Sequence, residues 1–323
     1  MISRRRFLAF GVLAALPARV GAQGRAARIG ILGPTPLETS VYANAVMQAF
    51  TQLGYAEGAR ASFRYRFAEG HLDLFRRQAQ EVVKVECDLV IGIRVESATR
   101  ALQLAKPAGP ILFLAIDYDP VESGVVSSLR RPDRNTTGVY VPQNVLIARR
   151  VALIRELLPQ ASRLMVFADP YSADQVEAAR KAAAAANFQL VLVQFVTQPY
   201  DYATYLQPRR GVGADAFMNL ASPVFAQDRQ QIHEALYRLG IPAMGSNTLQ
   251  AEAGFLLALG SSIPKVGRRV ADMGVRLLAG TKPSAMPVEL ADEFELVVNS
   301  RTAKALGIKL AESVLARATR VIE

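Results

Sequence analysis

Two apolar runs decide the fold of this chain: Asp88-Leu89-Val90-Ile91-Gly92-Ile93 and Pro110-Ile111-Leu112-Phe113-Leu114-Ala115-Ile116. Neither run alternates between apolar and polar residues, a pattern typical of strands buried on both faces of a parallel sheet. Residues 96–105, between the two runs, predict a helix. A strand, a helix and a second strand in this order indicate a doubly wound α/β architecture.

The same alternation of short apolar runs and longer amphipathic segments continues on both sides of this unit. Apolar residues at helical spacing, such as Val46, Phe50 and Leu53, mark a helix that ends at Gly54. Further strands are predicted at 28–33, 62–67, 137–141, 163–168, 189–196, 214–220, 241–244, 255–259 and 288–298, and further helices at 72–84, 145–158, 173–187, 200–209, 227–239 and 264–279.

The pattern divides into two successive α/β halves of about five strands each, and a chain of this length exceeds what one compact core usually holds. We therefore expect two doubly wound parallel-sheet lobes joined by a multi-strand hinge. The segment after about residue 260 is too short for a domain of its own, so we expect it to return to the first half. The predicted first lobe comprises 27–141 with 261–287, the second comprises 142–260 with 288–300, and 301–323 forms a C-terminal helix or tail.

The N-terminus reads as a cleavable export signal over residues 1–22. Arg4, Arg5 and Arg6 precede an apolar run, and small residues follow at Val20-Gly21-Ala22. The apolar run has about 10 residues, whereas a membrane-spanning helix needs about 20. Ser3-Arg4-Arg5-Arg6-Phe7-Leu8 also resembles the twin-arginine export motif, although an ordinary secretory signal reads almost the same. The alternative, a buried first helix, would leave the three arginines without an acidic partner. We expect cleavage after Ala22 and a periplasmic protein.

Composition limits the classes of partner. Of the 323 residues, 51% are hydrophobic and 20% charged, which is typical of a globular protein. Four of the 38 basic residues lie in the predicted signal, which leaves 34 basic against 28 acidic residues, a net charge of +6. The excess is scattered and export separates the protein from nucleic acid, so we expect no nucleic-acid binding. Cys87 is the single cysteine, which excludes an internal disulfide; without a cysteine near the cleavage site we expect a freely released, soluble protein.

Polar side chains follow the predicted strands, where open α/β sheets bind ligands. Hydroxyls and helix N-termini suit a carboxylate, carboxylates suit an ammonium group, and tyrosines suit an apolar or aromatic group. Together they favour a zwitterion such as an amino acid. The alternative is that many of these residues are caps and turns, as Ser172 would be at the start of the helix that follows it. The candidate ligand-binding residues are Thr35, Arg94, Ser97, Asp117, Tyr118, Tyr140, Asp169, Tyr171, Ser172, Asn219 and Ser246.

Signatures of catalysis are mostly missing from the sequence. The two histidines, His71 and His233, lie on or beside predicted amphipathic helices, and together with Cys87 they lack the spacing of a metal site. The chain has no Gly-x-Ser-x-Gly elbow, no Walker A pattern and no dinucleotide loop, so we expect no metal and no cofactor. Catalysis by carboxylates alone stays open, but no pair is singled out for it.

A set of short motifs resembles the solute-binding proteins of ABC transporters, in the group that includes tryptophan- and other amino-acid-binding members. The resemblance covers nearly the whole chain after the signal and implies the type I periplasmic-binding-protein fold. Its motifs are residues 29–32, Phe50-Thr51-Gln52-Leu53-Gly54-Tyr55-Ala56-Glu57-Gly58, 119–121, 124–126, 131–132, 135–138, Lys282-Pro283-Ser284-Ala285-Met286-Pro287-Val288-Glu289, 294–299 and 302–307.

One segment departs from the family pattern. Where the third strand ends, the family usually carries a small Gly-Thr-Pro-Ala-like turn, and this chain has Gly92-Ile93-Arg94-Val95-Glu96-Ser97-Ala98. A charged arginine and glutamate in the wall of the cleft change the expected ligand class towards an acidic or polar solute.

The resemblance implies a monomeric extracytoplasmic receptor that closes two lobes on a small polar solute and delivers it to the permease of an ABC importer in the inner membrane. Two alternatives are an exported hydrolase-type enzyme on the same scaffold and a ligand sensor that docks on a membrane receptor. The sequence lacks the nucleophile and metal-binding motifs of such enzymes, which argues against the first alternative. The sequence does not separate transport from sensing.

Overall fold

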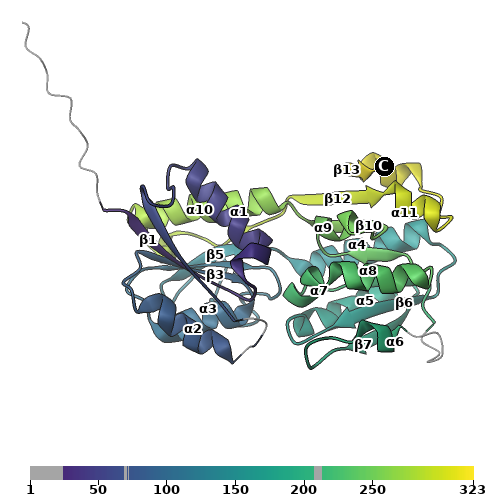
Figure 1. Cartoon of the computed structure of the whole chain (residues 1–323), viewed down its shortest axis with the longest axis horizontal. Helices are drawn as coiled ribbons and strands as arrows, with labels where there is room; N and C mark the ends of the chain where they lie inside the picture. The colour runs from purple at the N-terminus through teal and green to yellow at the C-terminus, as the bar shows by residue number, and fades with distance from the viewer. Residues whose placement is uncertain (1–24, 69–70, 72, 207–212) are drawn as a thin grey trace, which may run out of the picture.

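Two parallel-dominated sheets form two lobes that lie side by side in the computed structural model of the chain, which describes residues 25–68, 71, 73–206 and 213–323 (Figure 1). The predicted export signal at 1–22 lies outside these residues. The two sheets confirm the α/β class expected from the apolar runs, and every residue of the strands Leu89–Arg94 and Ile111–Ala115 is buried.

The sheet of the first lobe has six strands, all parallel, in the order β11-β5-β4-β3-β1-β2. Its helices α1 (Val41–Gln52) and α10 (Ile263–Leu278) pack on each other and on one face, and α2 (Leu74–Val83) and α3 (Glu96–Ala105) cover the other. The strands are β1 (Ala27–Gly33), β2 (Ala61–Phe67), β3 (Leu89–Arg94), β4 (Ile111–Ala115), β5 (Thr136–Tyr140) and β11 (Glu289–Leu290).

The sheet of the second lobe has seven strands in the order β13-β12-β10-β9-β8-β6-β7, and only the pair β10–β12 is antiparallel. The strands are β6 (Arg163–Ala168), β7 (Gln189–Gln194), β8 (Ala216–Asn219), β9 (Ala243–Gly245), β10 (Leu257–Ser261), β12 (Phe294–Asn299) and β13 (Arg320–Ile322). The helices are α4 (Gln143–Leu157), α5 (Val176–Ala185), α6 (Tyr202–Tyr205), α7 (Pro223–Gln227), α8 (Arg229–Arg238), α9 (Thr248–Glu252), α11 (Ser300–Ala305) and α12 (Glu312–Arg317).

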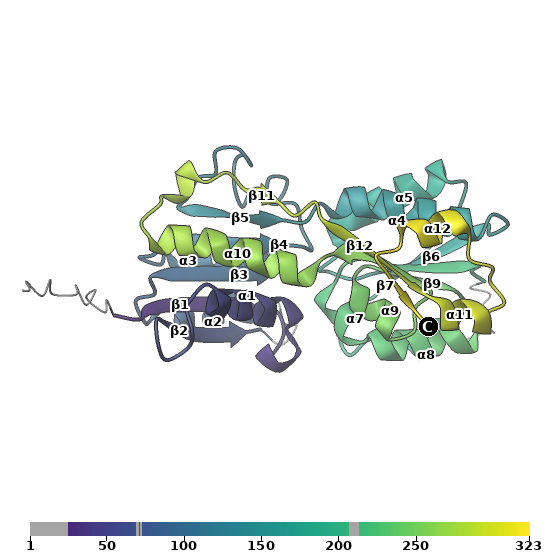
Figure 2. The same cartoon turned by 90° about the horizontal axis from the view of Figure 1, so that it is seen from above.

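The chain crosses between the lobes three times, after β5, after β10 and after β11. Figure 2 shows α10, far along the chain, lying over the first sheet. Short 3-10 turns occur at Leu37–Thr39, Ala173–Gln175 and Pro283–Ala285.

Two sheet memberships differ from the domain boundaries expected from the sequence. β11 pairs with β5, so the chain returns to the second lobe after Leu290 rather than at 288. The segment expected as a C-terminal helix or tail ends in β13, which pairs with β12 in the second sheet. The helix expected at 200–209 is described only as α6, and residues 207–212 lie outside the described part of the chain.

Candidate functional site

Two cavities lie between the lobes, at the carboxyl ends of strands from both sheets. The larger, of about 400 Å³, is lined by residues 95–97 and 117–119 after β3 and β4, and by 170–171 and 173–174 after β6. The smaller, of about 260 Å³, is lined by residues 38–42, by Arg94 and by residues of the second lobe at the start of α7 and α9. The facing ends of the two sheets therefore form the cleft that the sequence predicts.

All charged side chains that are buried in the described part of the chain lie at this boundary. They are Arg94 and Asp117 in the first lobe and Arg150 and Asp169 in the second, each at most 7% exposed. Buried charges are costly unless they are paired, hydrogen-bonded or reserved for a ligand. Two basic and two acidic groups at one boundary therefore indicate the functional part of the molecule.

Arg94 and Asp117 form a two-point ion pair at the ends of the adjacent strands β3 and β4. The Nε and Nη2 groups of Arg94 donate to the Asp117 carboxylate at 2.8 and 3.0 Å. Its guanidinium also lies over the ring of Tyr42, 5.3 Å from the ring centre. Burial raises the pKa of the Asp117 carboxyl, while Arg94 opposes that rise. Arg94 thus holds Asp117 as an internal partner, an arrangement that the sequence did not predict.

Asp169 follows β6 and accepts hydrogen bonds without a basic partner among the described residues. The hydroxyls of Ser222 and Ser172 donate at 2.5 and 2.8 Å, and the backbone N–H of Tyr171 at 3.1 Å. Burial raises the pKa of Asp169, the two serines lower it, and the charge of Asp117 across the cleft raises it further. This carboxylate is therefore held by neutral donors, without a bonded cation among the described residues.

Arg150 on α4 is fully buried and bonded to neutral oxygens. Its Nε donates to the carbonyl of Leu259 at 2.8 Å and its Nη2 to the carbonyl of Ser246 at 3.0 Å, while both terminal nitrogens lie 3.2 Å from Oε1 of Gln143. No carboxylate of the described chain is bonded to it. Burial lowers the pKa of Arg150 to about 9. The positive charge is held in place without a counter-charge.

Asn219, at the end of β8, contributes an unsatisfied amide at the same end of the second sheet. The residue is fully buried, and neither its Nδ2 nor its Oδ1 has a hydrogen-bond partner among the described residues. Such orphaned groups are rare in folded proteins and indicate a missing partner such as a solute or a water molecule.

The candidate residues from the sequence divide into three groups. Asp117, Tyr118, Ser97 and Tyr171 line the larger cavity, and Thr35 and Arg94 line the smaller. Asp169 is one of the buried charges of the second lobe, Ser172 bonds it, the carbonyl of Ser246 bonds Arg150, and Asn219 ends β8 of the same sheet. Tyr140 lines neither cavity. Its hydroxyl donates to Asp119 at 2.8 Å, and its ring packs in an apolar cluster. The Ser172 hydroxyl bonds Asp169 and does not cap the following helix, contrary to the alternative considered above.

Sequence reasoning missed Tyr42 and Arg150, which lie on helices rather than at strand ends. Arg150 lies at helical spacing from the buried apolar residues Leu146, Ile147 and Ile154 on α4. An arginine within such an apolar stripe indicates a buried, functional side chain and could have been recognised in the sequence. Tyr42 stands one helical turn before Val46 in the buried stripe of α1.

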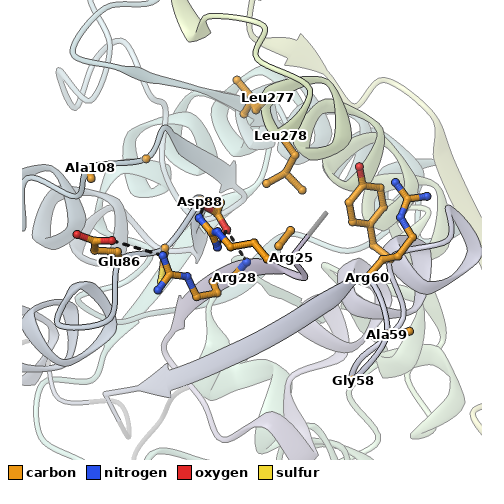
Figure 3. A pocket seen from close by; sticks show the side chains of 14 residues that line it. Arg25, Arg28, Gly58, Ala59, Arg60, Glu86, Asp88, Ala108, Leu277 and Leu278 are labelled. Carbon is orange, nitrogen blue, oxygen red and sulfur yellow. Dashed lines mark hydrogen bonds and ion pairs between the residues drawn. The ribbon is translucent and has the colours of Figure 1, made fainter. Parts of the chain in front are cut away.

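A more voluminous hollow, of about 1210 Å³, lies elsewhere, at the amino ends of β1 and β3 (Figure 3). Four of its charged groups form the ion pairs Arg25–Asp88 and Arg28–Glu86, and Arg60 lies over the ring of Tyr55. It involves a single lobe and the opposite end of the strands, so it does not qualify as the solute site.

The described residues hold neither a group of side chains suited to a metal ion nor a helix suited to a membrane. None of their histidine, cysteine and acidic side chains form a group of three or more that would hold a metal ion. No helix among them is long and apolar enough to cross a membrane.

Two α/β lobes with cavities and buried charges between the facing ends of their sheets are the architecture of a type I periplasmic binding protein. Residues 39–322 match the family of ABC transporter substrate binding proteins, and the chain belongs to this family. The resemblance in the sequence motifs is thereby confirmed.

Known relatives agree with this assignment. The chain is 23% identical over 271 residues to a tyrosine-binding protein from Clostridioides difficile (strain R20291), covering 81% of this chain and 75% of the relative. A solved structure of a conserved domain protein from Vibrio cholerae O1 biovar El Tor superposes with a TM-score of 0.82 and 26% identity, covering 92% of this chain and 100% of the other. An ABC domain from Streptococcus pneumonia in complex with L-Trp gives the same TM-score and coverage at 24% identity.

Proposed function

We propose that this protein is the extracytoplasmic receptor of an ABC importer and that it binds an amino acid, as a zwitterion, between its lobes. The observation that carries the proposal is the pair of unmatched buried charges in the second lobe. Arg150 is held by carbonyl and amide oxygens, and Asp169 by hydroxyl and N–H groups, so neither has an ionic partner within the described part of the chain. A solute with one carboxylate and one ammonium group would supply both.

The polar and aromatic groups around these charges support the same class of solute. The free amide of Asn219 has both a donor and an acceptor to offer, which suits a carboxylate or an ammonium group equally. Tyr171 lines the larger cavity and is buried, so its ring would cover the apolar part of a side chain. Two relatives are described with aromatic amino acids, L-Trp and tyrosine, which supports an amino acid here.

Location and partners follow from the family and from the N-terminal segment. We infer that residues 1–22 direct export, that the protein is released as a monomer into the periplasm, and that its closed form delivers the solute to a permease. Binding without chemical conversion is in line with a family of substrate-binding proteins.

The test is a ligand panel on the protein purified from the periplasm. We expect isothermal titration calorimetry to give a Kd near the micromolar range, about −8 kcal/mol, for at least one neutral amino acid. At about 100 times Kd that ligand should add about 2.7 kcal/mol to the free energy of unfolding. Sugars and dicarboxylates serve as comparison solutes. Binding of one of these classes, with no response to any amino acid, would refute the proposal, as would turnover of the bound solute.

A further inference from the structure

The Arg94–Asp117 ion pair stands between the two cavities of the cleft. Arg94 lines the smaller cavity and Asp117 the larger, while their side chains are joined by two hydrogen bonds. Any solute held between the lobes therefore meets this pair from one side or the other.

Arg94 adopts a backbone conformation that arginine rarely tolerates. Its φ is 73°, in the left-handed region, and the N–H of Val95 donates to the carbonyl of Ile93 at 3.0 Å, which makes Arg94 the centre of a tight three-residue turn. Its carbonyl accepts the backbone N–H groups of Ile116 and Asp117 at 3.1 and 3.2 Å. Strain of this kind persists where the surroundings fix it, and it is concentrated at functional sites. The turn therefore fixes the guanidinium on Asp117.

Asp117 is the most deeply buried of the acidic residues that line the larger cavity. Asp117 is 3% exposed, whereas Glu122 and Asp174, which also line this cavity, are exposed, and water screens their charges. Glu96 is partly exposed and paired with Arg100 at 2.9 Å. Asp119, which also lines this cavity, is partly exposed and accepts hydrogen bonds from the Tyr140 hydroxyl and the Val121 N–H, both at 2.8 Å. By neutralising Asp117, Arg94 removes the most deeply buried negative charge from this wall of the cleft.

We propose that Arg94 is a specificity-determining residue that restricts the cleft to solutes without net charge. This inference rests on the proposed function, since it concerns the charge class of the amino acid. With Arg94 in place, Asp117 is unavailable to a cationic side chain and Arg94 is unavailable to an anionic one. The zwitterion's own charges are left to Arg150 and Asp169. Losing either member of the pair frees the other and shifts the preference towards solutes of the opposite charge.

The experiment compares Kd values for three amino acids of similar size: glutamine, lysine and glutamate. We expect Arg94→Ala to improve the affinity for lysine relative to glutamine by about tenfold, and Asp117→Asn to improve glutamate relative to glutamine by a similar factor. The double variant should favour neither. Arg94→Lys keeps a positive charge on Asp117 and should retain the neutral preference. Arg268→Ala and Asp272→Asn are matched controls, because they break an exposed ion pair on α10.

The outcomes separate this inference from the proposed function. If the wild-type protein binds none of the twenty amino acids, the proposed function fails. If it binds a neutral amino acid but the relative affinities of folded Arg94→Ala stay within twofold of wild type, only the role of Arg94 is refuted. Should Arg94→Ala be recovered unfolded, Arg94→Gln and Asp117→Asn give the same two-way test. Glutamine is replaced by the best neutral ligand of the wild type if glutamine itself does not bind.

Discussion

Asp169 of the second lobe is electrostatically coupled to Asp117 of the first lobe. Burial raises the pKa of Asp169 most, and the negative charge of Asp117 adds to the rise, although the two residues belong to different sheets. Arg94 compensates Asp117 directly, while Asp169 has hydroxyl and N–H partners. Burial lowers the pKa of Arg94, and Asp117 and Asp169 both raise it, so the Arg94 guanidinium offsets part of the repulsion between the two carboxylates. A further cation between the lobes would relieve the rest.

A pH dependence of stability follows from the raised pKa of Asp169. Because the folded protein holds the carboxyl proton more tightly than the unfolded chain, the contribution of Asp169 is fully present below its unfolded pKa, near 4, and is lost as the pH rises through the folded value. We expect the melting temperature of ligand-free wild type, measured relative to Asp169→Asn, to fall as the pH rises from about 4. Differential scanning calorimetry between pH 4 and 8 provides this measurement.

Asp215 serves as a control, because its pKa is lowered in the folded protein and its contribution to stability therefore changes with pH in the opposite direction. It accepts hydrogen bonds from the backbone N–H groups of Ser162 and Arg163, and these bonds lower its pKa. Its contribution is present above the unfolded pKa and is lost as the pH falls, so Asp215→Asn should cost stability at neutral pH and not in acid. For Asp169, the raised pKa would be contradicted if the melting temperatures of Asp169→Asn and wild type changed with pH in parallel.

Replacing Arg150 with alanine should destabilise the second lobe strongly. The substitution leaves the carbonyls of Leu259 and Ser246 without donors and opens a void in a fully buried position. Unsatisfied buried groups and a cavity together cost about 3 kcal/mol. Urea denaturation followed by circular dichroism measures this loss. The neighbouring Arg149 is exposed and lies over the ring of Phe294, so Arg149→Ala should cost less than about 1 kcal/mol. Equal losses for the two variants would show that the Arg150 network carries little of the stability.

The proposed export signal at residues 1–22 can be tested by mass spectrometry. The intact protein purified from the periplasm should lack residues 1–22, because the small residues of Val20-Gly21-Ala22 match a cleavage site. Replacing both Arg4 and Arg5 with lysine keeps the charge and should block export only if the twin-arginine route is used. Periplasmic material that retains Met1 would contradict the prediction of cleavage.

Most of the fold could be predicted from the sequence because the central strands are uninterrupted apolar runs. The runs at 88–93 and 110–116 became β3 and β4, and the return of 264–279 to the first lobe was expected and found as α10. β11 and β13 were missed as separate strands, since two or three residues carry no periodic pattern. Their pairing depends on long-range contacts that a local reading does not reveal.

The site residues that directly follow strands could be predicted from the sequence. Asp117 and Asp169 follow strands, and the carboxyl ends of parallel strands meet at one edge, so both could be assigned to the cleft. The ion pair of Arg94 with Asp117 depends on a left-handed backbone at Arg94, which no sequence pattern marks for an arginine. Arg150 and Tyr42 come from helices, and only their positions in apolar stripes gave a sign of their burial.

Tyr42 links the helix α1 of the first lobe to the crossing after β10. Its hydroxyl interacts with the side chain of Ser261, the last residue of that strand. Its ring lies under the guanidinium of Arg94, 5.3 Å from the ring centre. Tyr42→Phe removes the hydroxyl and its interaction with Ser261 but keeps the ring, so we expect ligand affinity to weaken by no more than about fivefold, the effect of one hydrogen bond of about 1 kcal/mol. Tyr42→Ala also removes the support under Arg94 and should weaken it further. Calorimetric titration gives the affinities, and small-angle X-ray scattering of the ligand-free variants reports whether the lobes open. If Tyr42→Phe binds as tightly as wild type and Tyr42→Ala does not, the ring rather than the hydroxyl stabilises the closed cleft.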